Sequence, residues 1–186
     1  MTSTRIFLGW FAALIIMPAA LMQGARPAMA LTLTSPAFKH GAAMPSRLTC
    51  EGEDRSPPLA WSGVPAGTKS LALIIDDPDA PDPKAPKRVW VHWIVFNLSP
   101  ELEGLPENAD KDGLPAGAGR GISDVKRADY HGPCPPIGRH RYFHKLYALD
   151  TMLDLEHPNK AELEAAMKGH VIAQAELIGT YQKGDR

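Results

Sequence analysis

Short apolar runs, separated by segments rich in proline and glycine, dominate the hydrophobic pattern of this chain. Residues 70–75 are almost continuously apolar and stop at an Asp-Asp-Pro sequence, which is typical of a buried strand that leads into a loop. Residues 89–98 and 142–150 predict two more strands, and alternation over residues 175–181 predicts a closing strand. The pattern therefore favours a mainly β fold whose strands are joined by proline-rich loops.

Two of these strands are expected to be covered on both faces. In residues 89–98 the alternating side chains form two sets, Trp90, His92, Ile94 and Phe96 on one face and Val89, Val91, Trp93 and Val95 on the other. In residues 142–150 the sets are Phe143, Tyr147 and Leu149, and Tyr142, His144, Leu146 and Ala148. Because both sets are largely apolar, we expect both faces of each strand to be buried.

Helical periodicity is found once, near the C-terminus. Asn159 followed three residues later by Glu162 matches a capping box. The side chains that then recur at helical spacing are Leu163, Ala166, Met167, His170 and Val171. Residues 100–120 are polar, glycine-bearing and turn-prone, and we interpret them as one long surface loop.

The N-terminus has the features of a secretory signal. Arg5 precedes an apolar run over residues 6–22, and a small-residue triplet ends at Ala30. We expect cleavage after Ala30, which leaves one domain over residues 31–186 in the periplasm or outside the cell. The alternative is a retained membrane anchor, for which the run is barely long enough, and no later apolar run could span a bilayer.

The charge balance argues against nucleic-acid binding. All 21 Asp and Glu residues follow residue 30, whereas two of the 20 Lys and Arg residues, Arg5 and Arg26, precede it, which leaves a net charge of about −3. Binding to a phosphate backbone needs a basic face, and this chain offers only the scattered Lys84, Lys87 and Arg88. We therefore expect no nucleic-acid partner.

The two cysteines, Cys50 and Cys134, are expected to form a disulfide. Export places both in an oxidising compartment, where an even count favours a bridge. The alternative is a pair of buried thiols.

Two segments around the predicted strands carry side chains suited to chemistry. Residues 76–81 place three carboxylates at a strand end, where sites are common, although a proline-stiffened turn capped by its own acids explains them equally well. His92 lies among indoles inside the next strand, and its ring nitrogens need partners, which Asp77, Asp79 or a bound anion would supply. The alternative is a core histidine satisfied by its surroundings.

A third segment, residues 130–142, is a rigid turn of prolines and glycines that delivers His140 and Tyr142 to the start of a strand. Glycine lets backbone N–H groups approach a ligand closely, and proline limits the entropy lost on ordering. His and Tyr add side-chain donors suited to phosphate or carboxylate. This segment predicts an anion pocket.

These segments contain three ordered sequence blocks: D-P-D-A-P at residues 77–81, W-x-H-W at 90–93 and Y-x-G-P-C-P-P-x-G-x-H-R-Y at 130–142. Together with residues 50–61 and 63–70, they resemble the phosphatidylethanolamine-binding protein family, and most nearly its bacterial Raf-kinase-inhibitor-like branch. The resemblance covers essentially all of the chain after the signal. One departure is Val91, where that branch often has a second aromatic residue.

The resemblance implies an antiparallel β-sandwich with few peripheral helices and one anion pocket. Carried across by motif, the residues that form or border the pocket are Asp77, Asp79, Trp90, His92, Gly132, Pro133, His140 and Tyr142. In this reading Tyr142 and turn amides donate to the anion, and Asp77 or Asp79 orients His92 or His140. Exported relatives carry cysteines at the positions of Cys50 and Cys134, which further supports their pairing.

Three functions are weighed on this basis. The first is an exported, non-enzymatic protein that binds phosphate, carboxylate or a phospholipid head group. The second is an inhibitor or regulator of a partner protein, either a protease or a kinase-like protein, as the family resemblance implies. The third is an enzyme or metal site built on the same Asp and His residues; because H-E-x-x-H and serine-elbow motifs are missing, we expect no metal, no cofactor and no catalysis.

Overall fold

Two antiparallel sheets form the body of the computed structural model, which describes residues 30–185. The larger sheet has the order β6-β4-β3-β7-β8, with the bounds β3 (Ser70–Asp77), β4 (Trp90–Leu98), β6 (Gly119–Arg120), β7 (His140–Leu149) and β8 (Val171–Tyr181). The smaller has the order β1-β2-β5, with β1 (Thr32–Thr34), β2 (Leu59–Ser62) and β5 (Gly104–Leu105). The predicted antiparallel β-sandwich is confirmed.

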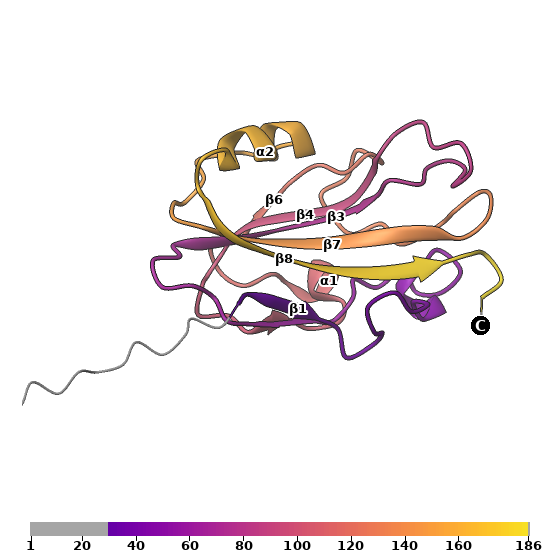
Figure 1. The fold of residues 1–186 in the computed structure, drawn as a ribbon, viewed down its shortest axis with the longest axis horizontal. Coiled ribbons are helices and arrows are strands. Elements are labelled where there is room, and N and C mark those ends of the chain that lie inside the picture. Colours follow the sequence, from indigo (N-terminus) through magenta and orange to yellow (C-terminus); the bar gives the residue numbers. More distant parts are fainter. Residues whose placement is uncertain (1–29, 186) are drawn as a thin grey trace, which may run out of the picture.

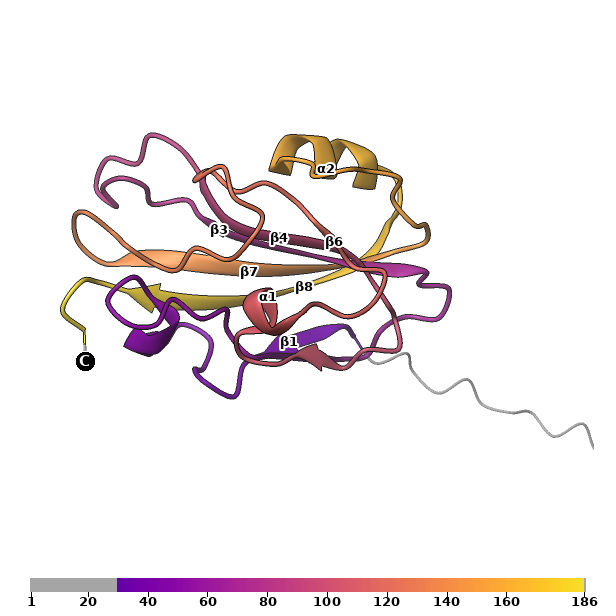
Figure 2. The ribbon, with the colours of Figure 1, turned by 180° about the vertical axis from the view of Figure 1, so that it is seen from behind.

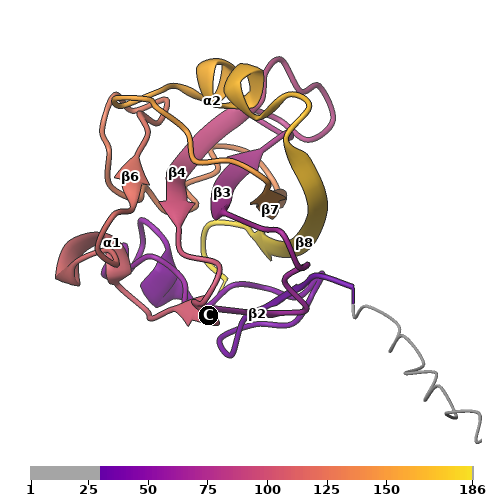
Figure 3. The same cartoon turned by 90° about the vertical axis from the view of Figure 1, so that its left-hand side faces the viewer.

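The elements are stacked in three layers. Helix α2 (Lys160–Met167) lies on one face of the large sheet, while the small sheet and the short helix α1 (Ala109–Asp112) lie on the other (Figure 1). The opposite view brings β6 and α1 to the front (Figure 2), and the view from the end shows α2 above β4 and β3 with β2 below them (Figure 3). A 3-10 turn, η1 (Ser46–Leu48), completes the described elements.

Strand β3 is the centre of the fold, because each of its eight residues is buried. Leu71, Leu73 and Ile75 belong to the core between the two sheets. Ala72 and Ile74 belong to a second core beneath α2. The continuous apolar run in the sequence is thus explained by a strand covered on both faces.

The alternation predicted for the second strand is wrong at one point. Trp93 pairs with Ile75 and Val91 pairs with Asp76, which leaves His92 as an extra residue in a β-bulge. Val91 therefore packs with the α2-side core, whereas Trp93 packs in the core between the sheets. The bulge changes the direction of His92, which now faces the ring of Tyr142 in β7, with a centroid separation of 5.2 Å.

The alternation predicted for the third strand is confirmed, and so is the capping box of α2. Asn159 accepts a hydrogen bond from the Glu162 amide, and the Glu162 carboxylate accepts one from the Asn159 amide. The predicted helix is too long, because it ends at Met167 before Gly169, which has a positive φ of 85°. Val171 instead opens β8, so the closing strand is longer than predicted.

The interpretation of residues 100–120 as one surface loop is also wrong. The segment contains β5, α1 and β6. Leu105 and Ala109 are buried in the core between the sheets, and Trp61 of β2 donates through its backbone to the carbonyl of Glu103. Leu102, Leu114 and Ala118 pack against the same core, so scattered apolar residues anchor this largely polar segment. Nothing in residues 30–185 forms a helix long and apolar enough to cross a membrane.

Candidate functional site

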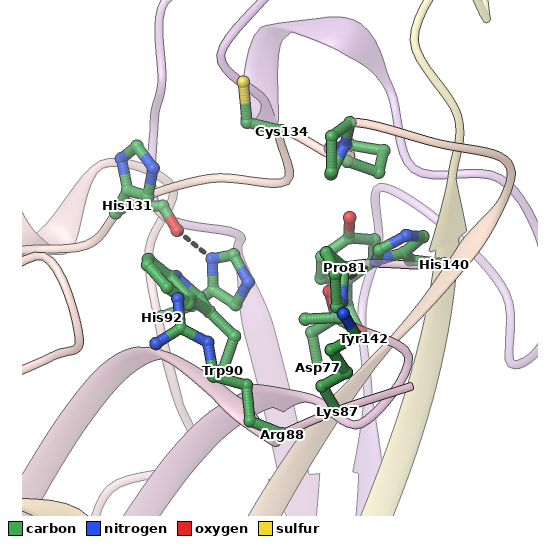
Figure 4. Close-up of a pocket in the computed structure, with 13 residues that line it drawn as sticks. Asp77, Pro81, Lys87, Arg88, Trp90, His92, His131, Cys134, His140 and Tyr142 are labelled. Carbon is green, nitrogen blue, oxygen red and sulfur yellow. Dashed lines mark hydrogen bonds and ion pairs between the residues drawn. The ribbon is translucent and has the colours of Figure 1, made fainter. Parts of the chain in front are cut away.

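A cavity of about 500 Å³ opens at the end of the large sheet where β3 ends and β7 begins. Two proline-rich loops face each other across it, residues 78–89 and residues 131–139 (Figure 4). The polar side chains that line it are Asp77, Lys87, Arg88, His92, His131, His140 and Tyr142. The other lining residues are Ala80, Pro81, Trp90, Cys134, Pro135 and Pro136. The cavity thus has polar groups on largely apolar walls, which is the usual make-up of a small-molecule site.

Asp77 and His140 form a buried pair on one side of the cavity. His140 Nδ1 lies 2.7 Å from Asp77 Oδ2, and His140 Nε2 lies 3.0 Å from the carbonyl oxygen of Ile137. The Ile137 carbonyl can only accept a hydrogen bond, so this contact needs a hydrogen on Nε2, and the Asp77 carboxylate faces Nδ1. Burial raises the pKa of Asp77, and the hydrogen bond from His140 opposes this rise. Both ring nitrogens of His140 are therefore occupied by partners of the described chain.

His92 stands on the other side of the cavity, held by two reciprocal bonds to His131. Its Nδ1 bonds to the His131 carbonyl oxygen, and the His131 amide donates to the His92 carbonyl oxygen over 3.2 Å. Nδ1 therefore carries the hydrogen. Burial lowers the pKa of His92 to about 4, so the ring is neutral at pH 7 and Nε2 is an acceptor. This atom is buried and has no partner among the described residues.

Tyr142 brings a second unpartnered group to the same floor. Its hydroxyl is buried and makes no hydrogen bond within residues 30–185. The ring packs edge-on against His92 and stacks on His140 with a centroid separation of 6.4 Å. Burial raises the pKa of the Tyr142 hydroxyl far above its usual value, so the group keeps its proton and can donate.

Two cationic side chains stand at the mouth of the cavity. The Arg88 guanidinium lies 4.0 Å from the centre of the Trp90 ring, an arrangement that fixes both side chains through a cation–π contact. Lys87 lines the cavity beside it, and neither cation forms a salt bridge with a carboxylate of the described chain. The mouth of the cavity therefore carries two positively charged side chains.

The wall that carries residues 131–134 is tied to the turn that follows η1. Cys50 and Cys134 are disulfide-bonded, with their Cα atoms 5.4 Å apart, so the predicted bridge is confirmed. The Gly132 amide donates to Asp54 Oδ1 over 2.7 Å, and the Cys50 amide donates to the Pro133 carbonyl over 3.1 Å. These bonds fix the position of the His131 carbonyl, which in turn orients His92.

The structure gathers five of the eight predicted site residues around the cavity, namely Asp77, Trp90, His92, His140 and Tyr142. The other three do not line it. Gly132 and Pro133 face the turn near Asp54, where a Cβ on Gly132 would come within 2.6 Å of the Leu48 carbonyl oxygen. Asp79 is paired with Arg141 at 2.7 Å, and Asp77 is the carboxylate that meets a histidine.

Sequence reasoning missed three polar lining residues. In the sequence pattern Lys87 and Arg88 count only as scattered cations, although their position directly before a predicted strand was an available signal. His131 lies within the turn but carries no distinguishing pattern, and its role depends on the bulge at His92.

In residues 30–185 no group of three or more His, Cys, Asp or Glu residues is arranged to hold a metal ion.

Fold and site together define a class: an antiparallel β-sandwich with a polar-floored cavity between two proline-rich loops at one end. The sequence model of the phosphatidylethanolamine-binding protein family matches residues 34–182. This chain belongs to that family, as its sequence blocks predict.

Relatives match over most of the chain. A UPF0098 protein of Methanothermobacter thermautotrophicus is 51% identical over 156 residues, which cover 83% of this chain and 100% of that protein. A crystal structure of a phosphatidylethanolamine-binding protein homologue from Chlamydia trachomatis is similar with a TM-score of 0.75 and 45% identity, over 83% of this chain and 98% of the other. The Escherichia coli protein YbcL is similar with a TM-score of 0.75 and 36% identity, over 83% and 99%.

Proposed function

We propose that this protein is an exported, non-enzymatic binding protein that holds a small anionic group in the cavity between residues 78–89 and 131–139. The group is a phosphate, a carboxylate or a phospholipid head group. One observation carries the proposal: the buried floor has two unpartnered polar groups, His92 Nε2 and the Tyr142 hydroxyl, beneath two cations. Buried polar groups normally have partners, so these two are arranged for the polar atoms of a ligand.

The proposal that the protein is not an enzyme is supported by the way the titratable groups of the cavity are used. His140 has both ring nitrogens occupied, by Asp77 and by the Ile137 carbonyl. His92 is pinned by His131 and has a pKa of about 4, too low for an efficient general base near neutral pH. No serine lines the cavity, and its one cysteine, Cys134, is in a disulfide, so the described lining offers neither of these nucleophiles.

Isothermal titration calorimetry of the purified protein with phosphate, acetate and phosphoethanolamine tests the proposal. We expect binding of at least one of these anions, weakened about tenfold or more in Tyr142→Phe, because that variant loses a hydrogen bond to a charged group. Lys69→Gln is the control, since this exposed lysine precedes β3 at the opposite end of the sheet. No heat of binding for any of the three anions would reject the proposal.

Export is the second part of the proposal. It is supported by the Arg5 and residue 6–22 pattern, which lies outside the described residues, and by the disulfide, a bond that persists mainly in oxidising compartments. We expect the protein recovered from the periplasm or the medium to begin at Leu31. N-terminal sequencing checks this, and a retained Met1 would contradict it.

Regulation of a protease or kinase-like partner is the alternative function. One observation favours it: Ile137, in the loop that borders the cavity, is 55% exposed and is an apolar side chain able to anchor a partner. Affinity capture with the wild-type protein, compared with Ile137→Ser, tests it. A specific partner lost in the variant supports this alternative, and identical captures reject it.

A further inference from the structure

The direction of the hydrogen bonds at His92 sets what a ligand has to offer. Because Nδ1 donates to the His131 carbonyl, Nε2 of the neutral ring has a lone pair and no hydrogen. The atom is buried, belongs to a side chain that lines the cavity, and has no partner in the described chain. An anion whose oxygens are all acceptors cannot donate a hydrogen bond to Nε2, and its oxygen lone pairs repel the lone pair of the ring nitrogen.

Tyr142 presents the complementary group. Its hydroxyl keeps its proton and has no partner within residues 30–185, so it can donate to an anionic oxygen. The floor thus presents one acceptor, on His92, and one donor, on Tyr142. The centres of the two rings are 5.2 Å apart. A phosphate group that retains a hydrogen has both matching atoms, a P–O–H donor and a P–O⁻ acceptor.

We propose that the cavity selects phosphate groups that carry a proton, either inorganic phosphate or a phosphomonoester, over sulfate and phosphodiesters, with His92 Nε2 accepting the P–O–H hydrogen bond. This inference rests on the proposed anion-binding function and narrows its ligand class. Sulfate is fully ionised near neutral pH and a phosphodiester has no acidic hydrogen, so neither can donate to His92.

The groups packed around His92 do not supply the missing proton. On β3, Asp76 is held by Lys145 and Lys160 at 2.8 Å and 2.6 Å, and Asp77 is paired with His140 Nδ1 at 2.7 Å. On β7, the hydroxyl of Tyr142 is the donor already assigned to the anion, and buried His144 directs Nδ1 to two backbone carbonyls.

From the loop before β7, His131 stacks on His92 at 6.1 Å and approaches Asp54 at 3.8 Å with its Nδ1. Asp124, from the segment that follows β6, accepts from the Val91 amide. Lys87 and Arg88 attract an anion at the mouth but are not bonded to His92. The hydrogen on which His92 depends therefore has to arrive with the ligand or be taken up from solution.

Calorimetric titrations at pH 6 with inorganic phosphate, methyl phosphate, sulfate and dimethyl phosphate test the proposal. At this pH His92 is neutral and about half of a phosphomonoester retains its proton. We expect phosphate or methyl phosphate to bind roughly 10- to 100-fold more tightly than sulfate and dimethyl phosphate, the effect of one hydrogen bond to a charged group. Sulfate has the greater charge, so attraction by Lys87 and Arg88 alone predicts the opposite order. Whether phosphate or methyl phosphate binds better distinguishes a free anion from an ester.

His92→Asn is the informative variant, because its amide can still donate to the His131 carbonyl but leaves nothing at the position of Nε2. We expect the preference for phosphate over sulfate to fall to within about threefold. Tyr142→Phe is the matched control and weakens both anions by a similar factor. If His92→Asn does not fold, the wild type gives a second readout: in buffers of different ionisation enthalpy, sulfate binding takes up a proton and phosphate binding does not.

The outcomes separate the inference from the function on which it rests. If the wild type binds none of the four anions, the proposed function fails. If phosphate and sulfate bind equally, or sulfate binds more tightly without proton uptake, the protein is an anion binder and the selectivity is overturned. A preference for phosphate that persists in His92→Asn overturns the role assigned to His92.

Discussion

Asp79 and Arg141 form a bidentate ion pair next to the cavity. Arg141 Nη2 lies 2.7 Å from Oδ1 of Asp79, and Arg141 Nε lies 2.9 Å from Oδ2. The backbone amide of Arg141 also donates to Oδ2. With its oxygens used in this way, Asp79 connects the loop after β3 to the start of β7, while Asp77, two residues earlier, meets His140.

Asp79→Asn is expected to lower stability more than it lowers anion affinity. The variant weakens a charge-assisted pair whose arginine is half exposed, so we expect a loss of roughly 1 kcal/mol in the free energy of unfolding. Phosphate affinity should change less than twofold because Asp79 does not line the cavity. Urea unfolding and calorimetry check both values. A tenfold loss of phosphate affinity in a fully folded variant would show that Asp79 does contribute to the binding site.

Loss of the disulfide should lower both the stability of the fold and the affinity of the cavity for anions. The bridge joins residues 84 apart in sequence, and its removal in Cys50→Ala/Cys134→Ala should cost roughly 2–5 kcal/mol of stability. Cys134 also lines the cavity, so anion affinity should fall even at temperatures where the variant is folded. Unfolding and titration at 10 °C and 25 °C measure the two effects. Unchanged affinity in the folded variant would show that the wall is positioned without the bridge.

Acid should destabilise the protein between pH 6.5 and pH 4. Burial lowers the pKa of His92 and of His144 from 6.5 to about 4, so over this interval the unfolded chain binds more protons than the folded one. The folded state therefore has its full stability, as far as these two histidines are concerned, above pH 6.5, and this stability is lost as the pH falls towards 4. Each histidine should contribute roughly 2 kcal/mol of loss between pH 7 and pH 5.

His144→Gln isolates half of this effect. The glutamine amide can still donate to the carbonyls of Tyr142 and Leu177 but does not titrate. We expect its urea-unfolding free energy to fall by roughly 2 kcal/mol less than that of the wild type between pH 7 and pH 5. Equal losses in the two proteins would mean that His144 is not kept neutral by burial.

The cations at the mouth should increase affinity in a salt-dependent way. Lys87→Gln/Arg88→Gln is expected to weaken phosphate binding about tenfold at low ionic strength, with a smaller difference in about 0.5 M salt, because exposed charges are screened. Lys69→Gln, which removes a charge at the far end of the sheet, should have no measurable effect. If the two variants behave alike, net charge and not position is responsible.

Most of the fold could be predicted from the sequence because its signals are local. The run at residues 70–75 is apolar on both faces and becomes the central strand, and the Asn159–Glu162 capping box starts a helix where it is expected. Residues 100–120 gave no such signal. Their short elements depend on Leu105 and Ala109 inserting between sheets that only the folded chain brings together.

The site could be predicted only in part, because its geometry depends on pairing between strands. Alternation alone assigns His92 to the face of Ile94, and the bulge that turns it toward Tyr142 is a property of the β3–β4 register. Likewise, sequence could not decide between Asp77 and Asp79 as the partner of a histidine. That choice follows from Arg141, whose amide and guanidinium occupy Asp79.

The phosphate affinity of the cavity should also depend on Asp54, a residue that does not line it. Asp54 has a positive φ of 54° and accepts a hydrogen bond from the Gly132 amide, next to the carbonyl that orients His92. Asp54→Ala leaves that amide without its partner, so we expect roughly 1–2 kcal/mol of lost stability and a several-fold loss of phosphate affinity. Asp54→Asn keeps an acceptor oxygen and should restore most of both, as unfolding and calorimetric titration would show. Should the asparagine variant bind phosphate as poorly as the alanine variant, the charge of Asp54 acting on His131, and not its bond to Gly132, is what the cavity needs.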